Sequence, residues 1–165
     1  MKAIVYTSGT GHTAAYAKIL GKKTGLPVYA LQEATKKLSQ GTQIIYLGWL
    51  FANHVQGYKN AAKFFEVKAV CAVGLCDTGT AIGQVRKANA IAQSLPLFTM
   101  QGGMDKTKLP GAQRFVINML IKGMSLKKKR SADDARMLYL LQHDADYVSE
   151  DHTAAFMEWF GQYTE

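Results

Sequence analysis

Short apolar runs along this chain alternate with longer segments in which apolar residues recur at helical spacing. Branched and aromatic residues predict strands at 2–6, 28–31, 43–48, 68–76 and 96–100. Apolar residues three and four apart predict helices at 14–23, 57–65, 81–93, 112–124, 131–142 and 151–163. Segments 43–48 and 68–76 are apolar almost throughout, as in parallel strands buried on both faces.

Strands that alternate with helices predict a parallel sheet made of right-handed βαβ units. Five such strands favour one α/β domain over residues 1–165, doubly wound, with strand order 2-1-3-4-5 and helices on both faces. In that fold a ligand lies at the carboxyl ends of the strands, where the first and third strands are neighbours. The segments 7–13, 49–56 and 76–79 therefore surround one crevice.

The segment after the first strand is rich in glycine and hydroxyl groups and leads directly into a helix. This arrangement points backbone N–H groups and the positive end of a helix at one place, which attracts a phosphate. A nucleoside-triphosphate loop would carry Lys where this chain has His12, whereas Gly9 to Ala14 fits the dinucleotide pattern G-x-G-x-x-A, with Glu33 about twenty residues later. Three hydroxyls, from Ser8, Thr10 and Thr13, favour a terminal monophosphate.

The same segment is also compatible with an ordinary turn in which Ser or Thr caps the helix. Its sequence from Ser8 to Thr13, SGTGHT, resembles the phosphate signature [ST]-x-T-G-x-T of the flavodoxin family, at the same place near the N-terminus. That family binds FMN. The resemblance implies FMN as cofactor, with its phosphate held by Ser8, Gly9, Thr10, Gly11, His12 and Thr13.

Two further segments match the loops that hold the flavin ring in flavodoxins. In the loop after the third strand, Trp49 takes the place of the aromatic residue beside the ring, and core packing is the alternative role for its side chain. Gly74 to Thr80 resembles the segment G-x-x-D-S, in which Asp77 matches the aspartate at the polar edge of the flavin; a helix N-cap is its other role. The implied ring contacts are Trp49, Leu50, Phe51, Asn53, Cys76, Asp77, Thr78 and Gly79.

Residues 113–124 are similar to a segment in a flavodoxin-like subgroup that includes the quinone-dependent protoporphyrinogen oxidases, which use FMN at the membrane face. Two functions follow from the resemblances. The favoured one is an electron carrier that exchanges electrons with a redox partner protein. The alternative is an FMN-dependent oxidoreductase that passes electrons from a tetrapyrrole to a quinone. No convincing acid–base pair is evident, so no catalytic residue is assigned.

Positive charge is concentrated in one part of this basic protein, which has a net charge of +8 and a pI near 9.5. Nine of its twenty Lys and Arg residues lie between positions 106 and 136. An apolar helix at 112–124 followed by a basic run predicts contact with an anionic membrane surface or partner. The alternative is a helix buried in the α/β sandwich beside solvated lysines. The basic run is Lys127, Lys128, Lys129 and Arg130.

Several classes of protein are disfavoured by what the sequence lacks. There is no stripe of aromatic and basic residues, so nucleic acid is not an expected partner. Cys71 and Cys76 are five apart on an expected strand, which forbids a disulfide between them, and no Cys/His spacing suits a metal. No apolar run is long enough to span a membrane, and the first strand leaves no room for a signal peptide. We expect a cytoplasmic protein with peripheral contact at a membrane.

Overall fold

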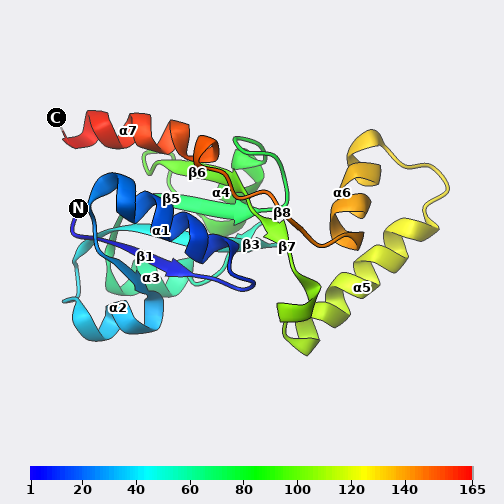
Figure 1. Cartoon of the computed structure of the whole chain (residues 1–165), viewed down its shortest axis with the longest axis horizontal. Helices are drawn as coiled ribbons and strands as arrows, with labels where there is room; N and C mark the ends of the chain where they lie inside the picture. Colours follow the sequence, from blue (N-terminus) through cyan, green and yellow to red (C-terminus); the bar gives the residue numbers. More distant parts are fainter. Residues whose placement is uncertain (165) are drawn as a thin grey trace.

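The computed structural model describes residues 1–164, and a five-stranded parallel sheet forms its centre (Figure 1). The strands lie in the order β2-β1-β3-β5-β6, so the predicted α/β class and the order 2-1-3-4-5 are confirmed. Pairing is parallel throughout this path, for example Val5 with Tyr29 of β2 and with Tyr46 of β3. The strands are β1 (Ala3–Thr7), β2 (Val28–Ala30), β3 (Gln43–Phe51), β5 (Glu66–Gly74) and β6 (Leu97–Gln101).

Helices cover both faces of the sheet, as predicted. On one face, Tyr16 of α1 (His12–Thr24) and Phe156 of α7 (Ala154–Thr164) pack against strand residues such as Ile45. The opposite face is covered by α2 (Leu31–Lys37), α3 (Tyr58–Phe64) and α4 (Ile82–Asn89). Side chains from alternate strand positions reach the two faces, which explains why the central strands are apolar almost throughout.

The segment expected to be a loop after the third strand is mostly strand. β3 continues to Phe51, turns through two residues and pairs antiparallel with β4 (His54–Val55). Both turn residues, Ala52 and Asn53, have positive φ, at 47° and 64°. A turn of this hand suits the twist of paired strands, and the sequence Ala-Asn is a weaker signal for it than Asn-Gly. The strand β5 ends before Cys76, and both cysteines are free thiols.

After β6 the chain leaves the sheet and forms a helical arm, residues 105–144, before it returns to α7. The arm begins and ends at two short antiparallel strands, β7 (Gly103–Met104) and β8 (Ala145–Asp146). It contains the 3₁₀ helix η1 (Lys106–Lys108), α5 (Gly111–Leu126) and α6 (Ala132–Gln142). Figure 1 shows α5 and α6 beyond the edge of the sheet, to the right, away from both helical layers. A second 3₁₀ helix, η2 (Glu150–Thr153), leads into α7.

The position of the arm shows that the helix predicted at 112–124 is not buried in the α/β sandwich, which was the alternative role for this helix. Phe115 is 65% exposed and Met119 is 59% exposed, whereas α7 occupies the place on the sheet that the last helix of the fold takes. Apolar spacing predicts that a helix has an apolar face but not which surface covers that face. Within residues 1–164, no helix combines the length and the apolar character needed to cross a bilayer.

Candidate functional site

A cavity of about 430 Å³ lies at the carboxyl ends of the strands, between the sheet and the arm. This volume falls in the range of pockets that bind small molecules. Two segments that follow strands β1 and β3 form its first wall, as the sequence predicted, and the end of β5 contributes Val73 to Cys76. The residues of the predicted site that line it are Thr10, His12, Thr13, Trp49, Leu50, Phe51, Asn53 and Cys76.

The polar end of the cavity lies where the chain enters α1, and the residues of the predicted phosphate segment that line it are Thr10, His12 and Thr13. Gly11 precedes the helix with φ of 109°, a conformation that glycine adopts without strain. The Ser8 hydroxyl accepts hydrogen bonds from the backbone N–H groups of Gly11 (3.2 Å) and Ala14 (3.4 Å). The first turn of α1 contains no acidic residue, so nothing there opposes an anion.

Two threonines complete this donor set. Thr10 and Thr13 both line the cavity, and Thr13 is only 2% exposed although its side chain is polar. Hydroxyl donors beside the positive end of a helix form the chemistry that a phosphate group requires. The residues present therefore fit the terminal phosphate of FMN.

Two aromatic rings stand beside this polar end. Trp49 and Phe51 occupy alternate positions of β3, so their side chains share one face, and their ring centroids lie 5.9 Å apart. A Cβ atom on Gly9 would lie 3.2 Å from the Trp49 indole, so glycine lets the loop approach that ring closely. Both rings line the cavity and offer it an apolar surface suited to a flat ring system.

The segment after β5 contributes less to the cavity than its resemblance implied. Burial raises the pKa of the Cys76 thiol, which lines the cavity and stays protonated at neutral pH. The Asp77 carboxylate instead pairs with Arg136 of α6. Thr78 Oγ1 accepts the backbone N–H of Gln101 at 2.9 Å, and the N–H of Gly79 donates to the Thr99 carbonyl. Asp77, Thr78 and Gly79 thus connect the end of β5 to the arm and to β6.

The second wall of the cavity comes from the arm, and the sequence analysis missed it. Helices α5 and α6 place only apolar side chains there, and Phe51 and Leu75 of the body pack against the same cluster. The sequence did carry a signal, because two helices between the fifth strand and the last helix have no further strand to cover. Met104 of β7 also lines the cavity, and the arm residues that line it are Leu109, Val116, Ile117, Leu120, Met124, Met137 and Leu141.

The cavity therefore has a polar end at the start of α1 and an apolar end beneath the arm. No group of acidic, histidine or cysteine side chains within residues 1–164 could hold a metal ion. Comparisons of the chain with protein-family models, with curated proteins and with solved structures found no match. The chemistry of the site itself therefore carries the functional argument.

Proposed function

We propose that this protein is an FMN-binding redox protein. One observation carries the proposal: hydroxyls and backbone N–H groups at the start of α1 open onto the same cavity as Trp49 and Phe51. A ligand with a phosphate at one end and a flat ring at the other matches both ends. Bound FMN would supply reversible transfer of one or two electrons, chemistry that no side chain provides.

In this proposal each part of the site has a separate task. Ser8, Thr10 and Thr13 donate hydrogen bonds to the phosphate, together with the backbone N–H group of His12. The N–H of Gly11, proposed from the sequence as a further donor, is bonded to the Ser8 hydroxyl. Trp49 and Phe51 hold the ring and exclude water from one of its faces. The turn at Ala52 and Asn53 lies at the rim of the cavity. No side chain is required as an acid or base, and the favoured role is an electron carrier for a redox partner protein.

The purified protein is expected to bind FMN with a flavin absorption spectrum, and FAD and NAD much more weakly. The physical reason is that the donors converge on one terminal phosphate, whereas a pyrophosphate would have to pass through the loop. Titration of the apoprotein with FMN, FAD and NAD, followed by flavin fluorescence or calorimetry, measures the three affinities. An apoprotein that binds NAD but shows no binding of FMN contradicts the proposal.

A second candidate function is an FMN-dependent oxidoreductase that acts on a quinone or a tetrapyrrole. The observation that favours it is the apolar arm wall, which lies over the place proposed for the flavin ring. A carrier needs an exposed flavin edge, whereas an oxidoreductase needs a space in which a substrate meets the ring away from water. Uncharged side chains such as Ile117, Leu120 and Met137 would suit an apolar substrate in that space.

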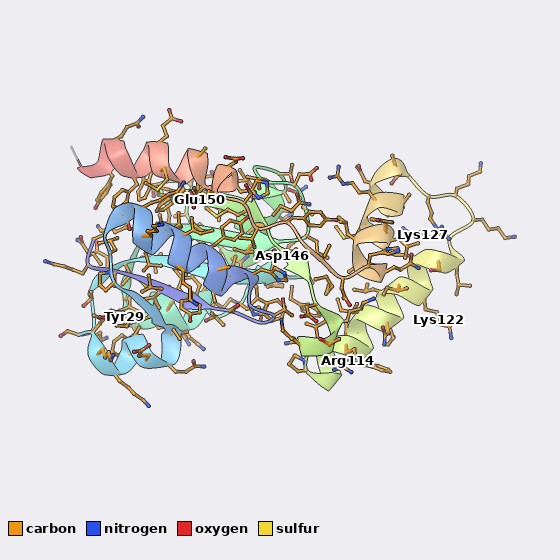
Figure 2. The ribbon with its side chains drawn as sticks, viewed as in Figure 1. Tyr29, Arg114, Lys122, Lys127, Asp146 and Glu150 are labelled. Atoms are coloured by element: carbon orange, nitrogen blue, oxygen red, sulfur yellow. The ribbon has the colours of Figure 1, made fainter. Side chains whose placement is uncertain are left out.

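The outer surface of the arm supports a membrane partner for this second function. Phe115, Met119 and Leu126 follow one stripe of α5 and are 65%, 59% and 74% exposed, and Lys122 lies in the same stripe. The arm carries nine Lys and Arg residues and four Asp residues, so two copies of it would repel one another. Figure 2 labels Arg114, Lys122 and Lys127 along the arm. An apolar stripe among cations matches an anionic lipid surface.

The double variant Lys128→Gln/Lys129→Gln is expected to weaken binding to anionic vesicles about 30-fold. Each Lys near an anionic leaflet contributes roughly 1 kcal/mol, and both side chains are exposed at the tip of the arm. Lys127 and Arg130 are left in place because they pair with Asp134 and with backbone carbonyls at the end of α5.

Co-sedimentation with vesicles of phosphatidylcholine and phosphatidylglycerol measures the change. The matched control is Lys18→Gln/Lys63→Gln, which removes two exposed charges from α1 and α3. Equal binding to pure phosphatidylcholine, or equal loss in the control, removes the anionic membrane as partner. An acidic protein then becomes the better candidate for this surface.

A further inference from the structure

His12 lies between the proposed phosphate site and the base of the arm. Its side chain is 12% exposed and lines the cavity at the start of α1. One ring nitrogen, Nδ1, is 2.9 Å from the Thr10 hydroxyl. The other, Nε2, is 3.8 Å from the Asp146 carboxylate on β8, which Figure 2 labels between α1 and the arm. Gly103 allows the imidazole to take this position, because a Cβ atom on residue 103 would lie 2.6 Å from His12 Nε2.

The Asp146 carboxylate, 3.8 Å from Nε2, favours one of the two neutral tautomers of His12. A carboxylate repels a nitrogen lone pair and attracts an N–H group, so the tautomer with its proton on Nε2 is favoured. Nδ1 then has only a lone pair, and it accepts the hydrogen bond from the Thr10 hydroxyl. The single hydroxyl hydrogen of Thr10 is thereby held by the imidazole and is not available to a phosphate.

Protonation of His12 reverses the bond to Thr10. Both nitrogens of an imidazolium are donors, so Nδ1–H donates to Thr10 Oγ1 and the Thr10 hydrogen is released. That hydrogen can then be donated to an anion in the cavity, while Asp146 faces the positive ring. The proton comes from solvent, and a phosphate dianion beside the imidazolium favours its retention.

The other titratable groups near His12 and Asp146 are compatible with protonation of His12. Burial raises the pKa of Tyr16, one turn further along α1, so its hydroxyl stays neutral, and it is bonded to His152 of η2. Lys108 of η1 interacts electrostatically with Asp146. The Asp146 side chain is 71% exposed, and its Oδ1 accepts the N–H of Val148 at 3.0 Å.

We propose that His12 is a positioning residue that couples phosphate binding to the uptake of one proton, through Asp146, His12 and Thr10. The proposal rests on the proposed FMN site and adds a regulation to it. Binding of FMN becomes tighter as pH falls, because the imidazolium frees the Thr10 donor and adds a positive charge. Phosphate monoesters keep their second charge above about pH 6, so the effect is separable from titration of FMN itself.

FMN titrations of the apoprotein at pH 7.0 and pH 8.5 test this coupling. The wild type is expected to bind FMN more weakly at pH 8.5 than at pH 7.0, by at most tenfold for each pH unit, the limit for one linked proton. His12→Gln is expected to lose this slope, and Asp146→Asn to bind more weakly at pH 7.0. Asp133→Asn, at an exposed position of α6, is the matched control and keeps the wild-type profile.

Calorimetry in two buffers of different ionisation enthalpy counts the protons directly. We expect the wild type to take up protons on binding FMN, at most one per FMN, and His12→Gln to take up close to none. If the wild type and His12→Gln bind FMN with the same pH profile, the role of His12 is overturned and the proposed FMN site is not. A wild type that takes up no FMN at either pH overturns the proposed function and the coupling together.

Discussion

Replacing Thr10 and Thr13 together by Val is expected to weaken FMN binding by a factor of about 10² to 10⁴. Each hydroxyl donates to a charged phosphate in the proposed complex, and a hydrogen bond to a charged group contributes about 1.5–3 kcal/mol. Val keeps the shape of Thr and removes only the donor. Thr13 is 2% exposed, so the methyl group that replaces its hydroxyl is not unfavourable for folding.

The control for this variant is Thr35→Val on α2, where the hydroxyl bonds to the carbonyl of Gln32 on the surface, outside the cavity. Affinity is measured by quenching of flavin fluorescence, and urea unfolding of the apoprotein shows whether the variants remain folded. A double variant that is folded and binds FMN as tightly as the control contradicts the phosphate site. It would leave the hydroxyls with the local role of shaping the turn before α1.

Phe156→Ala is expected to lower the free energy of unfolding by about 3–5 kcal/mol, the range for large cavities in tightly packed cores. The Phe156 ring is fully buried between α7 and the sheet. Its centroid lies 5.5 Å from Phe98, edge to face, and 5.7 Å from Trp159. Removing the ring leaves a cavity beside these neighbours and loosens α7, which covers one face of the sheet.

Phe115→Ala provides a comparison with the same chemical change on the arm. Phe115 is 65% exposed, so its loss is expected to change stability by no more than about 0.5 kcal/mol. Urea unfolding of the two variants measures both values. Similar losses for both variants would mean that Phe115 is covered in solution and that the arm lies against another surface.

The pattern along the chain was sufficient to predict the sheet and to place segments 7–13 and 49–56 at one end of it. Apolar runs and helical spacing depend on neighbours in sequence, so they predict strands and helices locally, and βαβ geometry then fixes their order. The segment from Ser8 to Thr13 was predicted to lie at the carboxyl ends of the strands for the same reason. The turn at Ala52 and Asn53 was missed because Ala is a poor signal for positive φ and the pair lacks the glycine of the usual two-residue turn, although Asn by itself favours that conformation.

Tertiary structure alone decided where the arm lies and what it contributes. The amphipathic pattern of α5 is equally compatible with the sandwich, with a partner and with a cavity wall, because a helical period says nothing about which surface covers the apolar face. The contact of Asp77 with Arg136, and that of His12 with Asp146, join residues 59 and 134 positions apart. No local pattern contains such pairs, since they exist only once the chain has brought β7 and β8 beside the start of α1.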